Sequence, residues 1–299
     1  MDRLTAMELF ARIVEGGTFA GAARDLGIAR STATLAITEL EADLGTRLLA
    51  RTTRHVSPTP EGAAFYHRAR ALLADVEETW AGFDGTPRGH LRINAPGLLT
   101  RTFLVPALPG FLARYPDITV SFGQTERLVD LVREGVDCVL RAGTPEDSSL
   151  MMRRLGTMAE VTCASPAYLA RHGTPRGTDD LDGHLCVGFV SSRTGEVMPL
   201  EFRDGDRLVT RQMPARVSTD NADTAADLAL QGFGLIQAPR YRFASALASG
   251  ALVEVLADTP PDPTPLNALY PGSRHLSRRL DVFLDWVGGI FDTGGPDRA

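Results

Sequence analysis

The stretch ARSTATLAITELEADLG, residues 29–45, is a predicted helix whose outward face consists mainly of small hydroxyl-bearing side chains. Its apolar residues recur at helical spacing, at Ala33, Ile37, Leu40 and Leu44, so the opposite face must point outward. Ser and Thr hydroxyls can bond a phosphate or a base edge, and their methyl groups, like a leucine, can touch the methyl group of thymine. The candidate contact residues are Ala29, Arg30, Ser31, Thr32, Thr34, Leu35 and Thr38.

Positive charge follows this helix directly. Arg47, Arg51, Arg54 and His55 lie in a stretch without an acidic residue, which suits a grip on phosphate groups beside a groove. Net charge alone does not indicate nucleic-acid binding, because the chain carries a formal charge of -6 and residues 1–58 contain as many acidic residues as arginines. Only this local cluster is basic.

The elements before residue 29 must position this helix. A first helix is predicted up to Gly16 and Gly17, and Thr18 is a suitable N-cap for a second short helix that ends at Gly27. Two short helices joined by a tight turn, the second with small polar groups outward, are typical of a helix-turn-helix that reads the major groove. From periodicity alone, a three-helix packing unit with a solvated face fits equally well.

A long helix is predicted next, from Thr59 to about Phe83. Thr59, Pro60 and Glu61 supply a capping hydroxyl, a proline at the first position and an acid in the first turn. An apolar stripe suited to a partner helix runs along it. Such a stripe is more often core, but a helix between two domains favours pairing with the same helix of a second subunit. Its residues are Phe65, Ala69, Leu72, Val76 and Trp80.

Composition sets the broad class of the protein. The chain has 299 residues, 43% hydrophobic and 23% charged, as expected for a soluble globular protein with two or more domains. It has no apolar run of about 18 residues and no N-terminal signal pattern, so we expect a cytoplasmic protein without a membrane partner. Cys138, Cys163 and Cys186 are odd in number and have apolar neighbours, which favours buried thiols over disulfides.

The order of residues is more specific than the periodicity. Residues 7–62 resemble, without a gap, the N-terminal winged helix-turn-helix of LysR-type transcriptional regulators. The matching positions include Ala22-Ala23, Leu40-Glu41, Leu44-Gly45, Arg51 and the Thr-x-x-Gly ending at Gly62. Members of this family usually have a Ser-Arg pair in the middle of the reading helix, where this sequence has Thr34 and Leu35.

The resemblance implies an α/β fold with a winged helix-turn-helix, a long linker helix and a two-subdomain effector domain of the periplasmic-binding-protein type (type 2). It implies as partners a double-stranded DNA operator, a small-molecule effector and a second copy of the chain in a dimer or tetramer, with RNA polymerase a further candidate. The expected bounds are 1–58 for the DNA-binding domain, 59–83 for the linker and dimerisation helix, 84–89 for a hinge, 90–292 for the effector domain (subdomain I 90–161 and 266–292, subdomain II 162–265) and 293–299 for a tail.

After the hinge, strand-like and helix-like runs alternate, which favours parallel α/β units, and a hairpin is predicted around Asp204-Gly205. Ligands of open α/β sheets bind beyond the carboxyl ends of strands, and the resemblance implies that three such loops line one cleft. Their N–H, hydroxyl and guanidinium donors suit a small organic anion, above all a carboxylate. The candidate effector contacts are Pro96, Gly97, Thr100, Arg101, Thr102, Arg141, Cys163, Thr219 and Asn221.

Each of these candidates also has a plainer explanation. A threonine before a helix is usually only a cap, and Arg141 is equally well explained by an internal ion pair with Asp137 or Glu146. Some members of the family sense oxidants through cysteine, yet Cys163 in its apolar context favours a buried, inert thiol.

No catalytic residue, metal ligand or cofactor is predicted. The sequence has no Gly-x-Ser-x-Gly elbow and no Gly-x-x-x-x-Gly-Lys loop, and its six histidines never occur as close ligand pairs. The competing hypothesis is an enzyme or a transport receptor on the same two-lobed fold. The missing acid–base constellation argues against an enzyme, and the missing signal peptide argues against a receptor.

Overall fold

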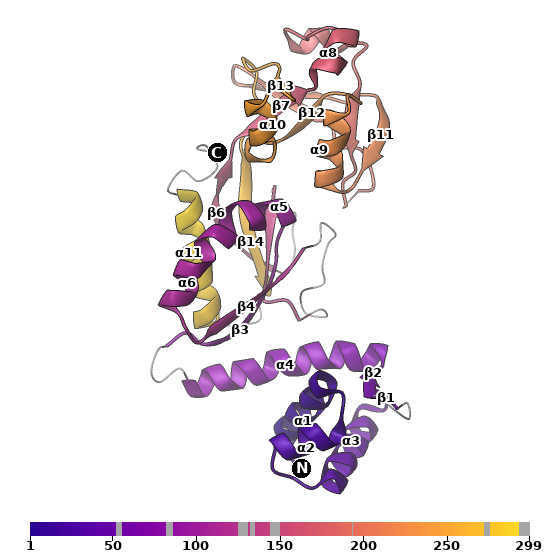
Figure 1. The fold of residues 1–299 in the computed structure, drawn as a ribbon, viewed down its shortest axis with the longest axis vertical. Helices are drawn as coiled ribbons and strands as arrows, with labels where there is room; N and C mark the ends of the chain where they lie inside the picture. The colour runs from indigo at the N-terminus through magenta and orange to yellow at the C-terminus, as the bar shows by residue number, and fades with distance from the viewer. Residues whose placement is uncertain are drawn as a thin grey trace.

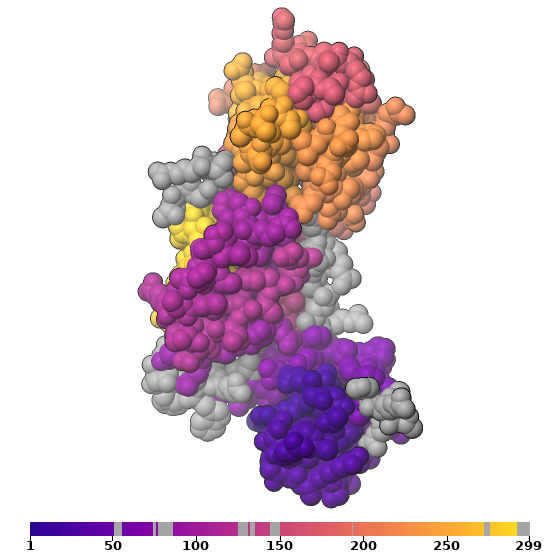
Figure 2. All heavy atoms as spheres, viewed as in Figure 1, coloured from indigo at the N-terminus to yellow at the C-terminus, as the bar shows by residue number. Residues whose placement is uncertain are grey.

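A computed structural model describes residues 1–51, 56–81, 86–124, 131, 135–143, 150–192, 194–271 and 276–292. A small helical unit at the N-terminus is followed by the long helix α4 and then by two subdomains built on sheets (Figure 1). The space-filling view places the N-terminal unit at one end of the molecule and the second subdomain at the other, with the first subdomain between them (Figure 2). Among the described helices, none is long and apolar enough to cross a membrane.

The N-terminal unit consists of α1 (Arg3–Gly16), α2 (Phe19–Asp25) and α3 (Arg30–Leu44) around an apolar core. The predicted N-cap of α2 is confirmed, since Thr18 Oγ1 accepts a hydrogen bond from the Gly21 backbone N–H at 3.1 Å. This bond satisfies one of the free N–H groups at the helix start. The fully buried members of the core are Leu9, Phe10, Ile13, Ala33 and Ile37.

The predicted helix ends are also confirmed. Gly17 has a φ of 67° and Gly45 a φ of 66°, a left-handed conformation that glycine adopts at little cost. The predicted apolar stripe of α3 is wrong at one position, because Leu44 is 44% exposed while Ala36 is buried. Leu44 is the last residue of α3, directly before the left-handed turn at Gly45.

A two-stranded wing connects α3 to α4. β1 (Leu49–Arg51) and β2 (Val56–Pro58) pair antiparallel, and α4 (Pro60–Ala81) begins directly after them. The predicted cap of α4 is confirmed, because Thr59 Oγ1 accepts a hydrogen bond from the Gly62 N–H at 2.9 Å. α4 lies beside the first three helices and reaches towards the first subdomain (Figure 1).

The first subdomain is built on a five-stranded sheet with the order β4-β3-β5-β14-β6. β3 runs parallel to β4 and β5, whereas β14 is antiparallel to β5 and β6. The predicted parallel units are confirmed for β3, β4 and β5, and the returning strand β14 lies antiparallel between β5 and β6. The strands are β3 (Gly89–Asn94), β4 (Ile118–Gly123), β5 (Cys138–Ala142), β6 (Leu150–Met158) and β14 (Thr264–Pro271).

Helices on one face of this sheet bury its core. α5 (Gly97–Leu99), a π-helical turn (Thr100–Leu104) and α6 (Val105–Arg114) follow β3, and α11 (Arg278–Asp292) lies beside α6 (Figure 1). The Phe111 ring centroid of α6 lies 4.8 Å from that of Trp286 in α11, a separation typical of favourable aromatic pairs. Both side chains pack in the core cluster of this subdomain.

The second subdomain contains smaller sheets. β7 pairs antiparallel with β12 and β13, and β8 pairs parallel with β11. The predicted hairpin at Asp204-Gly205 is confirmed by the antiparallel pairing of β9 with β10. The strands are β7 (Glu160–Ala164), β8 (Cys186–Phe189), β9 (Leu200–Asp204), β10 (Arg207–Arg211), β11 (Ala215–Thr219), β12 (Ile236–Pro239) and β13 (Val253–Glu254), and the helices are α8 (Pro166–His172), 3-10 turns at Thr178–Leu181 and Arg240–Phe243, α9 (Ala222–Leu230) and α10 (Ala244–Ala248).

Candidate DNA interface and effector site

The predicted reading face of α3 is open to solvent. Its buried side holds Ala33, Ala36, Ile37 and Leu40, and the side chains opposite are exposed, with Thr34 half-buried on the flank. Ala29 occupies the N-cap position without a side-chain hydrogen bond. The exposed predicted contacts are Ala29, Arg30, Ser31, Thr32, Leu35 and Thr38.

Two hydroxyl groups of this face are already bonded within the helix. Thr34 Oγ1 donates to the Arg30 carbonyl oxygen at 3.0 Å, and Thr38 Oγ1 donates to the Thr34 carbonyl oxygen at 2.9 Å. Hydroxyl groups of Ser and Thr inside helices commonly bond one turn back in this way. While these bonds persist, both hydroxyl groups can only accept a hydrogen bond from another molecule.

The wing is attached to α3 by one carboxylate. Glu41 Oε1 accepts hydrogen bonds from the backbone N–H groups of Leu48 and Leu49, at 2.8 and 3.0 Å. The side chain of Arg47 is 79% exposed, and its Nη1 lies 3.8 Å from Glu41 Oε2, a weak surface pair that leaves Arg47 available to a phosphate. The side chain of Arg51, and Arg54 and His55 as a whole, lie outside the described residues.

The predicted dimer stripe of α4 is partly used within the chain itself. The Phe65 ring packs edge-on against Phe10, with centroids 5.4 Å apart, and Ala69 is buried. Ala69 is therefore not available to a partner helix, and the half-buried Phe65 is partly covered by α1. Leu72 is 44% exposed and Val76 is half-buried, whereas the side chain of Trp80 lies outside the described residues.

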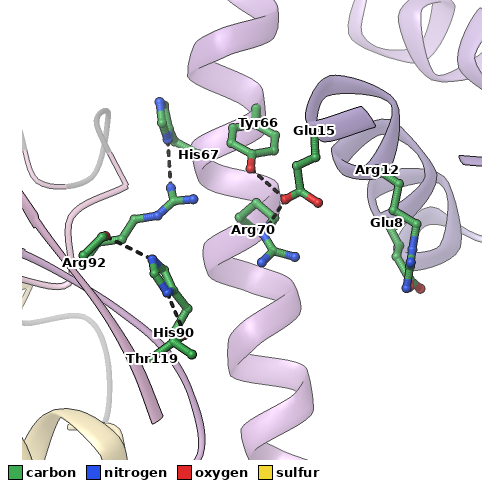
Figure 3. A network of polar contacts seen from close by, with 10 residues as sticks. Glu8, Arg12, Glu15, Tyr66, His67, Arg70, His90, Arg92 and Thr119 are labelled. Carbon is green, nitrogen blue, oxygen red and sulfur yellow. Dashed lines mark hydrogen bonds and ion pairs between the residues drawn. The ribbon is translucent and has the colours of Figure 1, made fainter. Parts of the chain in front are cut away.

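Two neighbouring residues of α4, Tyr66 and His67, connect the N-terminal unit to the first subdomain (Figure 3). The Tyr66 hydroxyl donates a hydrogen bond to Glu15 Oε1 of α1 at 2.7 Å, and Arg70 Nε lies 3.4 Å from the same oxygen. On the other side, His67 Nδ1 lies 3.1 Å from Arg92 Nη1 of β3. Polar contacts therefore hold α4 from both sides.

The contact with Arg92 defines the protonation state of the His67 ring. A guanidinium group donates hydrogen bonds and accepts none, so His67 Nδ1 must accept, which requires the neutral ring. The Arg92 guanidinium carbon also lies 5.8 Å from the Tyr66 ring centroid, within the range of a cation–π contact. A Cβ at Gly135 would stand 2.8 Å from the His67 Cβ, which shows how closely the first subdomain rests on α4.

An ion-pair cluster joins two of the three predicted effector loops. Arg101, in the segment after β3, has its Nη2 3.5 Å from Oδ2 of Asp223 in α9. Arg242 Nη1 lies 2.7 Å from the other oxygen of this carboxylate, and its side chain is 6% exposed, against 61% for Arg101. Two guanidinium groups therefore share one carboxylate, and the looser, more exposed one is Arg101.

Several other predicted effector contacts make hydrogen bonds within their own loops. Thr100 is buried, and its hydroxyl donates to the Pro96 carbonyl oxygen at 3.0 Å. Asn221 Oδ1 accepts from the Thr224 N–H at 2.9 Å, and Thr219 Oγ1 accepts from the Asn221 N–H at 3.1 Å. Of these, only the Asn221 contact is a helix N-cap, that of α9, whereas Thr100 bonds one turn back along its helix and Thr219 bonds within its loop. Half-buried candidates at the same loops are Pro96, Gly97 and Thr102.

The remaining two predicted effector contacts, Arg141 and Cys163, differ in the exposure of their side chains. Arg141 is half-buried in β5 opposite Asn267 of β14 and has an interaction partner within the chain. The placement of Cys163 at the effector site is wrong, because its side chain is fully buried in an apolar cluster with Val161, Val187 and Ile236. Burial raises the pKa of the Cys163 thiol to about 12, so it remains the unreactive thiol.

The chain crosses between the subdomains beside a half-buried carboxyl group. Glu160 begins β7, Thr264 begins β14, and the Thr264 hydroxyl donates to Glu160 Oε1 at 2.6 Å. Burial raises the pKa of Glu160 from 4.5 to about 7, against the opposite effect of the Thr264 hydrogen bond.

Glu160→Gln is expected to stabilise the protein above neutral pH. Because the pKa of Glu160 is higher in the folded state, its contribution to stability is present below pH 4.5 and is lost as pH rises through about 7. Glutamine does not ionise, so the variant does not lose this stability as pH rises. The unfolding free energy of the variant should therefore exceed that of the wild type only slightly at low pH, and by up to about 3 kcal/mol above pH 7. Denaturant unfolding of both proteins across this range measures it, and a pH-independent difference would show that the carboxyl group is solvated.

Sequence reasoning missed the polar residues that join the parts of the molecule. Arg242, Tyr66, His67 and Arg92 lie in regular elements outside the predicted motifs, and Asp223 ends a predicted effector loop without being named as a contact. The alternation in HLRIN does place Arg92 on the face of β3 opposite Leu91 and Ile93. What covers that face depends on contacts distant in the sequence, which no local pattern indicates.

These observations define a class of protein. An exposed helix beside a two-stranded wing, joined by a long helix to two sheet-based subdomains, is the architecture of a DNA-binding protein with a separate ligand-binding part. Among the described residues, no group of three or more His, Cys, Asp or Glu side chains could hold a metal ion.

Comparisons with known proteins agree with this class. Residues 4–63 match the family model described as bacterial regulatory helix-turn-helix protein, lysR family, and residues 84–291 match the LysR substrate binding domain. The chain belongs to the LysR family of bacterial transcriptional regulators. It is therefore a DNA-binding regulator of transcription with an effector-binding domain.

Similarity to individual members extends over nearly the whole chain. The HTH-type transcriptional regulator YhjC of Escherichia coli is 34% identical over 97% of this chain and 98% of its own length. An HTH-type transcriptional repressor of Pseudomonas aeruginosa is 34% identical over 97% of this chain and 93% of its own. The structure of CrgA, a LysR-type regulator from Neisseria meningitidis, matches with a TM-score of 0.59 at 32% identity, covering 96% of this chain and 98% of that one.

Proposed function

We propose that this regulator binds a dyad-symmetric operator as a dimer, with α3 in the major groove and the wing on the adjacent backbone, and that a small organic anion bound between the subdomains changes this binding. The observation that carries the DNA part is the exposed outer face of α3 beside a wing that Glu41 holds in place. Such a protein works in the cytoplasm, where the chromosome lies. A tetramer and a contact with RNA polymerase stay predictions, as do the domain bounds given above.

The dimer follows from the apolar stripe of α4. Phe65 and Leu72 are one heptad apart and so lie on the same side of the helix. α1 covers the first of them through Phe10 and leaves the second 44% exposed. The uncovered part of the stripe is suited to the same helix of a second subunit.

The operator is tested by selection from randomised DNA with the full-length chain. We expect a site with two related halves whose affinity falls steeply with salt, since phosphate contacts release counterions. Recovery of no sequence, or of sites without symmetry, would contradict the proposal. The same experiment supplies the operator for the measurements below.

The effector class follows from the charge at the subdomain junction. Arg101 shares Asp223 with the closer and better buried Arg242, so a carboxylate ligand can pair with Arg101 without leaving Asp223 unpaired. Hydrogen bonds between charged groups are stronger than neutral ones. We expect the partly exposed Thr102 and Gly97 of the same segment to orient such a ligand.

Arg101→Gln is expected to weaken binding of the anion about tenfold or more, because it removes one charged hydrogen-bond donor. Calorimetry of the full-length protein against a panel of small carboxylic acids measures this. Arg278→Gln is the matched control, since its side chain is 63% exposed, against 61% for Arg101, and pairs with Asp281 in α11. Binding of neutral or cationic compounds alone, or equal affinity in the Arg101 variant, would contradict this proposal.

The contact of Arg92 with α4 offers a route from effector to DNA. Arg92 touches His67 and Tyr66, and Tyr66 bonds to Glu15 of the N-terminal unit (Figure 3). In Arg92→Ala we expect the anion to bind as in the wild type and to have less effect on operator affinity. An unchanged effect would mean that the signal takes another route.

A further inference from the structure

The centre of the reading face of α3 is a leucine. Leu35 is 59% exposed, the largest exposed fraction among the large apolar side chains that the structure describes. A single exposed leucine is ordinary on a protein surface, but Leu35 lies between Ser31 and Thr38, each about one turn away on the same face. Any DNA that α3 contacts through this face must therefore meet an apolar side chain at its middle.

The threonine hydroxyl groups beside Leu35, those of Thr34 and Thr38, cannot donate hydrogen bonds to a base. The protons of Thr34 and Thr38 are used in bonds to carbonyl oxygens one turn back, at 3.0 and 2.9 Å. The remaining donors on this face, Arg30, Ser31 and Thr32, lie at the N-terminal end of α3. At Leu35 itself and on its C-terminal side the surface therefore offers methyl groups and acceptor oxygens, and the nearest donor is the Ser31 hydroxyl one turn before it.

This surface chemistry discriminates between bases in the major groove. Guanine presents two acceptors, N7 and O6, which a leucine side chain and threonine hydroxyls that only accept cannot bond. Adenine and cytosine present an amino group that a threonine oxygen can accept from, and thymine alone presents a methyl group. An apolar side chain between acceptor oxygens therefore fits a step with a thymine methyl and disfavours guanine.

We propose that Leu35 is a specificity-determining residue that reads one thymine in each half of the operator through the 5-methyl group of that base. The proposal rests on the proposed function in one respect, that α3 enters the major groove. It adds which residue selects the base and which atom of the base is selected.

The test removes only the 5-methyl group of thymine from the operator. Each thymine of the selected operator is replaced in turn by deoxyuridine, and the affinity of the full-length protein is measured. We expect a loss of about fourfold at one thymine in each half-site, the value for about 0.8 kcal/mol of apolar contact per methyl-sized group. In Leu35→Ala the same replacement should have no effect at that thymine, while replacements elsewhere keep their effects.

Leu44→Ala is the matched control. Leu44 is also exposed, at 44%, and belongs to the same helix, but it lies nine residues further on, about two and a half turns, so it points to the opposite side. This variant should keep the full sensitivity to deoxyuridine. Leu35→Arg gives a second, positive readout, because repeated selection should replace the thymine by guanine, whose N7 and O6 accept from a guanidinium group.

The possible outcomes separate this inference from the proposed function. If selection recovers no operator, the proposed function fails and this inference fails with it. If an operator is recovered but the wild type shows no methyl-sensitive thymine, or Leu35→Ala keeps the same sensitivity, only the role of Leu35 is overturned. Both alanine changes are at exposed positions, and an unchanged melting temperature confirms that the variants are folded.

Discussion

Gly62→Ala, the addition of a single methyl group, is expected to abolish operator binding. A Cβ at this position, in the first turn of α4, would stand 1.9 Å from the carbonyl oxygen of Leu48 and 2.8 Å from its carbonyl carbon. These are backbone atoms at the start of the wing, so they cannot rotate away as a flexible side chain does. The same oxygen accepts a hydrogen bond from the Thr59 N–H at 2.9 Å, which the methyl group would disturb.

The expected cost is about 3–5 kcal/mol of stability, in the range of the most damaging single substitutions. Because the N-terminal unit holds the wing against α3, this loss should appear both as early unfolding of residues 1–81 and as loss of affinity for the selected operator. Hydrogen exchange locates the unfolding, and a gel-shift assay measures the affinity.

Gly110→Ala is the matched control for this substitution. Gly110 is also a helical glycine, in α6, and a Cβ there would have no neighbour within 4 Å. Alanine favours a helix interior over glycine by about 0.5–1 kcal/mol, so this variant should be equally or slightly more stable and should bind DNA normally. Equal behaviour of the two variants would show that α4 does not pack on the Leu48 backbone as described.

Features of the fold that depend on neighbours in the sequence could be predicted. The caps at Thr18 and Thr59 and the glycine ends at Gly17 and Gly45 follow from hydroxyl groups and left-handed backbone within a few residues. The outward face of α3 follows from the helical period. The hairpin at Asp204-Gly205 follows from its turn residues.

Features that depend on contacts between residues distant in the sequence could not be predicted. β6 was missed, because its run LMMRRLGTM lacks a clear alternation and pairs with β14 more than 100 residues later. Likewise nothing near Phe65 indicates that Phe10 partly covers it, so periodicity alone predicts that the whole apolar stripe of α4 faces a partner helix. Periodicity shows that a face is apolar, but only tertiary contacts show what covers it.

The same distinction between local patterns and distant contacts applies to the two candidate sites. The reading face could be predicted because it belongs to one helix, and its exposure is now seen directly. The effector loops could be predicted only as separate loops, and the pair between Arg101 and Asp223 that joins two of them spans 122 positions in the sequence. The sequence does not show on which side of its strand Cys163 lies, and in the structure its side chain is buried in an apolar cluster.

Leu72→Asp is expected to separate the dimer and to lower the affinity for a two-half-site operator at least about 100-fold. The side chain is 44% exposed in the single chain, so aspartate there costs little in the folded monomer. In the dimer both subunits would place a carboxylate in an apolar seam, where an unpaired charge is very unfavourable, and each 1.4 kcal/mol of this penalty is a factor of ten. Sedimentation measures the dimer, and titration with whole and half operators measures the affinity.

Leu208→Asp is the matched control for charge and exposure. Leu208 is 45% exposed and lies in the β9–β10 hairpin of the second subdomain, away from α4. This variant should remain dimeric and bind the operator normally, while Leu72→Asp should still bind a single half-site as weakly as the wild type does. If Leu72→Asp remains dimeric, the exposed part of the α4 stripe is not the contact between subunits, and the two reading helices must be brought together by the effector domains.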